Sequence, residues 1–292
     1  MLFRKAIHSF FFGNFLIAFS AVALTHLSQT GNKISSDDLH LLIFVFFSTL
    51  LVYNLNFIVG MNGLKASSFR SDRHNWIVKH EKIIWIFTII ALIISVAELF
   101  VLKKETIIFL FLPGILALGY AVPIKVPGLK TIRFRELPFV KIFLVAWVWG
   151  TFTVGLPIVQ QIGIKELVNT EFFLLFFSRS VFIFAITIPF DIRDLTYDSD
   201  KQIATLPSRF GIEKSKYFSV VLLFLFSAVT FLRFQFNFCN RAELAALVLS
   251  AISTAILVLM ISKTRKELFY SGLIEGTMLI QWLLVLLLSK IF

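Results

Sequence analysis

Charged residues and cysteines are scarce in this chain. Only 15% of its 292 residues are charged, whereas 58% are hydrophobic. A water-soluble domain of this length would not have this composition. With a single cysteine, Cys239, the chain can form neither an intrachain disulfide nor a metal site built from several cysteines. No cleavage pattern of small residues follows the N-terminus, so we expect a retained membrane helix there and not a removed signal peptide.

The hydrophobic residues gather in runs of about 20, enough for a helix to cross a hydrocarbon core of about 30 Å. These runs predict an all-α fold, a multi-pass transmembrane bundle of about nine helices that forms one integral membrane domain over residues 1–292. The expected spans are roughly 7–27, 39–62, 82–102, 106–122, 138–159, 171–190, 216–236, 242–262 and 270–289.

The formal net charge of +11 is distributed unevenly between the two sides of such a bundle. Most basic residues fall in the N-terminal segment and in the expected loops 63–81, 123–137, 191–215 and 263–269. By the positive-inside rule, these segments are cytoplasmic and the C-terminus lies outside. Basic loops also suit anionic lipid headgroups, so the predicted partner of the charge is the lipid bilayer and not nucleic acid.

Three acidic residues, Asp191, Asp194 and Asp198, follow the apolar run 172–190. On a helix their spacing of three and four places them on one face, where they repel each other unless a cation lies among them. Mg²⁺ is a natural partner because it prefers carboxylate and phosphate oxygens. The alternative is a solvated helix end whose acids pair with Arg193 and other basic residues nearby. Their position where a membrane helix meets water favours an ion site.

Residues 191–211 resemble the second Asp-rich motif of the UbiA-type membrane prenyltransferases. That motif reads Asp-x-x-Asp-x-x-x-Asp, followed by a Gly-Ile-x-Thr-Leu-Pro segment and a Leu/Phe-Gly pair. The matching positions are Asp191, Asp194, Asp198, Ile203, Thr205, Leu206, Pro207 and Gly211. Gln202 stands where the family usually has glycine. Tyr120, in Tyr-Ala-Val-Pro, resembles the start of the family's Tyr-x-x-Pro turn after the fourth span.

The resemblance implies a transferase of alkyl groups other than methyl, which moves an isoprenoid chain from a prenyl diphosphate to an acceptor. The acceptor would be hydrophobic or aromatic, as a quinone precursor is, and Mg²⁺ would be the cofactor. Asp194 and Asp198 would be catalytic, and together with Asp191 they would hold the metal. The loops 63–81 and 191–215 would carry the site.

One departure from the family concerns its first motif, Asn-Asp-x-x-Asp-x-x-x-Asp, after the second span. The best register begins at Asn54 and places Leu55, Ile58 and Asn62 at the three acidic positions, so no acid remains. Basic residues can substitute for the metal ion that the missing acids would hold, because the arginine fork binds phosphate bidentately. The expected diphosphate-binding residues are Asn54, Asn62, Arg70, Arg73 and Arg193. The alternative for the arginines is topological, since cytoplasmic loops are basic in any case.

Two charged residues, Arg179 and Glu275, lie inside expected spans, where a charge needs a partner or a water-filled cavity. Together with Tyr120 they are the expected residues of the acceptor cavity, and an interhelical ion pair or snorkelling is the alternative for the two charges. The lost first motif also leaves a second function open: a catalytically impaired relative that binds an isoprenoid lipid or scaffolds membrane enzymes.

Overall fold

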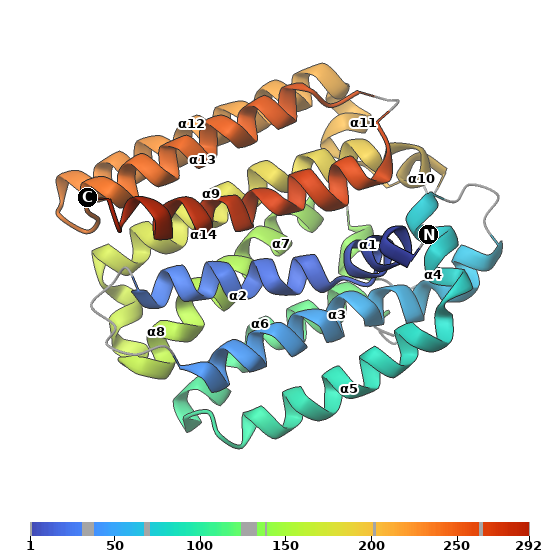
Figure 1. Ribbon diagram of the computed structural model, residues 1–292, viewed down its shortest axis with the longest axis horizontal. Coiled ribbons are helices and arrows are strands. Elements are labelled where there is room, and N and C mark those ends of the chain that lie inside the picture. Colours follow the sequence, from blue (N-terminus) through green and yellow to red (C-terminus); the bar gives the residue numbers. More distant parts are fainter. Residues whose placement is uncertain are drawn as a thin grey trace.

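The computed structural model describes residues 2–30, 38–66, 71–123, 133–137, 139–200, 203–262 and 265–291. Long helices lie side by side in one bundle (Figure 1). Eight of the helical segments in these ranges are long and apolar enough to cross a membrane. They are α3 (Leu39–Ala66), α5 (Glu81–Leu99), α6 (Lys104–Ala121), the run from α7 to α8 (Val140–Gln161), α9 (Thr170–Arg193), α12 (Ile212–Gln235), α13 (Arg241–Leu259) and the run from η4 to α14 (Phe269–Leu288). The predicted all-helical membrane bundle is confirmed.

The N-terminal segment differs from the single helix expected over 7–27. It forms two helices, α1 (Leu2–Phe12) and α2 (Phe15–Thr30), because Gly13 and Asn14 interrupt the run. Asn14 has a φ of 66°, in the left-handed region that asparagine tolerates better than most residues. The break turns the fully buried Asn14 side chain into the bundle.

Short helices gather at one end of the bundle (Figure 1). They include α4 (Asp72–Lys79), α10 (Leu195–Asp200) and α11 (Leu206–Phe210), beside α1. Ser71 caps α4, since its hydroxyl accepts a hydrogen bond of 3.3 Å from the backbone N–H of His74. These short helices belong to two of the expected loops, 63–81, which is basic, and 191–215, which begins with the three acids.

Two wide π-helical turns interrupt the long helices. The first, η2 (Thr151–Gly155), joins α7 (Val140–Gly150) to α8 (Leu156–Gln161), and the second, η4 (Phe269–Ile274), leads into α14 (Glu275–Leu288). Neighbouring helices approach closely here: a Cβ added at Gly150 would lie 2.9 Å from the Phe176 ring. Such turns are rare and frequently occur at functional sites.

Helix α9 lies at the centre of the bundle and α5 at its edge. Two thirds of the apolar stretch of α9 is buried (67%), against 22% for α5. Phe182, Ala185 and Ile188 of α9 are fully buried, and the helix packs mainly against α12 and α7. Helix α9 therefore connects the interior of the bundle to the acids that follow residue 190.

Candidate functional site

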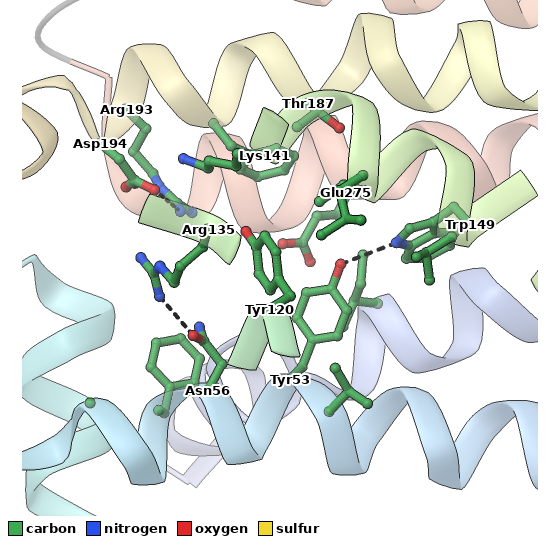
Figure 2. Close-up of a pocket in the computed structure, with 18 of the residues that line it drawn as sticks. Tyr53, Asn56, Tyr120, Arg135, Lys141, Trp149, Thr187, Arg193, Asp194 and Glu275 are labelled. Carbon is green, nitrogen blue, oxygen red and sulfur yellow. Dashed lines mark hydrogen bonds and ion pairs between the residues drawn. The ribbon is translucent and has the colours of Figure 1, made fainter. Parts of the chain in front are cut away.

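A cavity of about 220 Å³ lies between α3, α6, α7, α9 and α14 (Figure 2). Charged side chains line it toward the end that bears the short helices, and these are Arg73, Arg133, Arg135, Lys141, Arg193, Asp194, Glu267 and Glu275. Apolar and aromatic side chains line the rest, among them Val148, Trp149, Ile183, Ile186 and Met278. The cavity can therefore hold a ligand with an anionic end and an apolar body.

Two of the predicted acids share one lysine. Lys141, in the first turn of α7, places its Nζ 2.7 Å from Asp191 Oδ1 and 3.5 Å from Asp198 Oδ2. Both aspartates are almost completely buried, with 1% of their surface exposed. Burial raises the pKa of the Asp198 carboxyl above its ordinary value, and the Lys141 charge opposes that rise.

The third acid, Asp194, is held by its neighbour Arg193. The Arg193 guanidinium donates two hydrogen bonds to Asp194, from Nε to Oδ1 at 2.8 Å and from Nη2 to Oδ2 at 2.9 Å. Its Nη1 also donates to Glu267 Oε1 at 3.0 Å. Burial alone would raise the pKa of Asp194, but the Arg193 charge outweighs it and holds this pKa well below its ordinary value. Asp194 is therefore ionised at neutral pH.

The leading asparagine of the degenerate motif acts through a neighbour. Asn54 is fully buried and accepts a hydrogen bond of 2.7 Å from Asn14 Nδ2. The other amide atom of Asn14, Oδ1, accepts from Arg73. Arg73 also lies over the Phe57 ring, at 5.1 Å, and 3.9 Å from Glu275 Oε1. Asn54 thus anchors the residue that orients Arg73 in the cavity.

Of the remaining predicted residues, some line the cavity and others lie away from it. Tyr120 and Glu275 line the cavity. Asn62 is exposed and is not part of the lining. Arg70 lies outside the described residues. Arg179 faces a second cavity at the other end of the bundle.

Several contacts between cavity residues could not be predicted from the sequence. Arg135 Nη1 donates to Asn56 Oδ1 at 2.7 Å, so Asn56 lines the cavity where Asn54 does not (Figure 2). Near the apolar end, Trp149 Nε1 donates to the Tyr53 hydroxyl at 3.3 Å. These partners lie on different helices, and only a tertiary fold brings them together.

The family resemblance implies Mg²⁺, and the three carboxylates are the groups that could hold it. Asp191 Oδ2 accepts no hydrogen bond, and Asp198 Oδ2 accepts none either but has the Lys141 ammonium 3.5 Å away. Carboxylate oxygens of this kind are the ligands that Mg²⁺ prefers. Within the described ranges, no three His, Cys, Asp or Glu side chains lie close enough to form a metal site. An ion held here would therefore need oxygens of a bound ligand in addition to those of the acids.

A family-level comparison matches most of the chain. The model described as the UbiA prenyltransferase family matches residues 78–274. No curated protein matches the sequence.

Solved structures resemble this bundle over nearly its whole length. A structure from work on digeranylgeranylglyceryl phosphate synthase in membranes is 16% identical, with a TM-score of 0.60, over 99% of this chain and 100% of that chain. A UbiA homologue from Archaeoglobus fulgidus, bound to GPP and Mg²⁺, is 14% identical, with a TM-score of 0.62, over 96% of each chain. A UbiA homologue from Aeropyrum pernix K1 is 15% identical, with a TM-score of 0.58, over 95% of each chain. At these identities the likeness establishes a shared fold.

Proposed function

The chain belongs to the UbiA prenyltransferase family, and from this premise we propose that it is a membrane-embedded prenyltransferase. It transfers an isoprenoid chain from a prenyl diphosphate to a hydrophobic or aromatic acceptor. The observation that carries the proposal is a single cavity with five buried or half-buried cations at one end and an apolar wall at the other. The solved homologue that holds GPP and Mg²⁺ in the same fold supports it.

The cationic end is the proposed diphosphate site. Its cations are Arg73, Arg133, Arg135, Lys141 and Arg193, and all five are at least half-buried. Charges in a site that excludes water stabilise a departing diphosphate more strongly than they would in bulk solvent. Of the residues expected from the sequence, Arg73 and Arg193 take this role directly. Asn54 supports Arg73 through Asn14.

Asp191, Asp194 and Asp198 would hold Mg²⁺, which when bound supplies positive charge to the diphosphate. Lys141 already balances two of these acids, and Arg193 balances the third. In a relative with a complete first motif, the acids of that motif would bind a further metal ion. In this chain, arginine and lysine side chains therefore supply part of the positive charge that such an ion would bring.

The uncharged and aromatic part of the cavity is the proposed site of transfer. The bond between the allylic carbon and the diphosphate oxygen breaks, and the oxygen keeps the electron pair. The ring faces of Tyr120 and Trp149 can stabilise the allylic cation that remains. The acceptor then attacks this carbon and loses a proton. Glu275 lines the same cavity, and its buried Oε2 accepts no hydrogen bond, so this oxygen can take the proton.

We also propose that the end with the short helices faces the cytoplasm. The basic residues of the N-terminal segment and of the loops 63–81 and 191–215 support this orientation through the positive-inside rule. The C-terminus would then lie outside.

Turnover by the purified protein tests the proposed function. The protein is supplied with Mg²⁺, a series of prenyl diphosphates of increasing length and a panel of aromatic acceptors. We expect diphosphate release and a prenylated product. Asp194→Ala should lower the rate by about 100-fold or more, the usual scale for loss of an electrostatic catalytic group. Glu213→Ala, an exposed acid at the start of α12, is the matched control and should leave the rate unchanged. Absence of release with every donor, in the wild type and in Asp194→Ala alike, would contradict the proposal.

A second function is favoured by one observation: each of the three acids already has a protein cation as its partner. A site neutralised in this way can bind a prenyl diphosphate and present it without turnover. Saturable binding of a prenyl diphosphate, with no release in any acceptor mixture and no effect of Mg²⁺, would support this function over the enzyme.

A further inference from the structure

A second cavity, of about 670 Å³, lies at the end of the bundle opposite the candidate site. It lies between α2, α9, α12, α13 and α14, beside the turn that joins α12 to α13. That turn and the C-terminus lie at the same end (Figure 1). We call it the distal cavity. Its rim carries the exposed residues Asn237, Asn240, Arg241 and Ser289, so a ligand can enter from this end.

Two arginines in the wall of the distal cavity are almost completely buried. Arg179 is 4% exposed and Arg233 is 1% exposed. Arg233 Nη2 donates to Glu243 Oε1 at 3.1 Å, while its buried Nε has no hydrogen-bond partner. Arg179 Nη1 donates to the backbone carbonyl of Leu24 at 2.8 Å. Arg233 thus has a carboxylate as its counter-ion, whereas Arg179 donates to a neutral carbonyl.

The charges that line the distal cavity do not cancel. They are Arg179, Arg233, Arg241, Glu171 and Glu243. In the part of the chain that the structure describes, no carboxylate lies within ion-pair distance of Arg179. A buried cation without a counter-ion is costly inside a membrane bundle, and such residues usually mark a ligand or an ion path.

The remaining wall is mostly apolar, apart from Ser178 and Gln281. Its apolar members include Leu27, Leu175, Phe226, Leu247 and Leu286. A ligand that matches both the arginines and the apolar wall has an anionic group and a hydrocarbon body. The arginine fork matches a phosphate geometrically, with two parallel N–H donors.

We propose that the distal cavity is a binding site for a phosphate group, carried by an anionic lipid, with Arg179 as its main ligand. It is separate from the diphosphate site: Arg179 and Asp191 lie on the same helix, 12 residues and hence about 18 Å apart. The site therefore gives the chain a second phosphate-binding position, which the transfer reaction does not use.

Binding to the delipidated, full-length protein in detergent tests the proposal. Native mass spectrometry follows the titration with phosphatidylglycerol, and with zwitterionic phosphatidylcholine in parallel. A second arm adds inorganic phosphate alone and follows thermal unfolding. We expect phosphatidylglycerol to bind at least about tenfold more weakly to Arg179→Gln than to the wild type, which corresponds to about 1.4 kcal/mol. The matched control is Lys104→Gln, an exposed cation that lines neither cavity.

A cavity-filling variant separates loss of the site from misfolding. Leu286→Trp keeps every charge but occupies the apolar wall, so it should weaken lipid binding while Arg179 stays in place. Stabilisation by inorganic phosphate that depends on Arg179 would also support a phosphate site, with free anions as its source. Equal binding of phosphatidylglycerol to the wild type, Arg179→Gln and Leu286→Trp would overturn the proposal, as would Arg179-independent binding of both lipids.

Discussion

Helix α9 carries charge in two places, and the protein balances it differently at each. At the end of the helix, Asp191 and the acids just beyond it are each matched by a cation from the chain, Lys141 or Arg193. In the first half of the helix, Arg179 has only a backbone carbonyl as its hydrogen-bond acceptor in the described structure. The acids are close to neutralised without a ligand, whereas Arg179 is not. Removing a single partner should therefore have its largest effect at the acids.

The largest expected effect is that of Lys141→Ala. This change leaves Asp191 and Asp198 buried side by side without their shared cation, which should lower the free energy of unfolding by about 3–5 kcal/mol. Because Mg²⁺ can replace the lost charge, it should stabilise the variant more than the wild type. Thermal unfolding in detergent, with and without Mg²⁺, measures both effects.

The control is Lys216→Ala, whose partner Glu213 is 69% exposed. Loss of that pair should cost less than about 1 kcal/mol, because its acid is solvated. If both lysine variants unfold alike and neither responds to Mg²⁺, Lys141 does not balance the acids in the way described.

A middle-sized effect should distinguish the two asparagines of the degenerate motif. Asn54→Ala leaves the buried Asn14 amide without its acceptor, which should cost about 1–3 kcal/mol and weaken diphosphate binding through Arg73. Asn62→Ala, at an exposed position, should stay within about 0.5 kcal/mol of the wild type. Calorimetric titration with a prenyl diphosphate and thermal unfolding are the measurements. Equal effects of the two changes would count against the role assigned to Asn54.

The smallest expected effects are differences in pH dependence between the acids. The pKa of Asp194 is lowered in the folded state, so its stabilising contribution is present above the ordinary value of 3.8 and is lost as the pH falls below it. The pKa of Asp198 is raised, so its contribution is present below 3.8 and is lost as the pH rises. The advantage of the wild type over Asp194→Asn should therefore shrink at acidic pH. The advantage of the wild type over Asp198→Asn should shrink as the pH rises from about 4 toward neutrality, because Asp198 of the unfolded chain ionises from about pH 4 upward. Parallel pH profiles of the two variants, followed by thermal unfolding, would contradict these assignments.

The sequence predicts those features that depend on neighbours along the chain. Runs of apolar residues are enough to predict the helical membrane bundle, and the end of the run 172–190 correctly places the three acids where a long helix ends. The expectation that they share one face of a single helix is wrong, because α9 ends at Arg193 and Asp198 lies in the separate helix α10. The pairing of Asp194 with Arg193 is also local, and it follows the alternative in which the acids pair with basic residues of the protein.

Features that depend on packing between distant segments could not be predicted. Lys141 reaches the acids from another helix, 50 residues earlier than Asp191 in the sequence. Asn14 lies in the cavity region only because the N-terminal helix breaks at Gly13, which hydrophobicity alone does not reveal. Arg179 was expected near the acceptor, but its position along α9 directs it to the distal cavity.

Equilibrium binding of geranyl diphosphate to the purified protein tests the central claim most directly, without requiring turnover. The wild type should bind it in a saturable manner, and Arg73→Gln should bind it at least about tenfold more weakly, which corresponds to about 1.4 kcal/mol. Identical affinity in the two proteins, or no binding to the wild type at any Mg²⁺ concentration, would contradict the claim that this cavity holds a prenyl diphosphate.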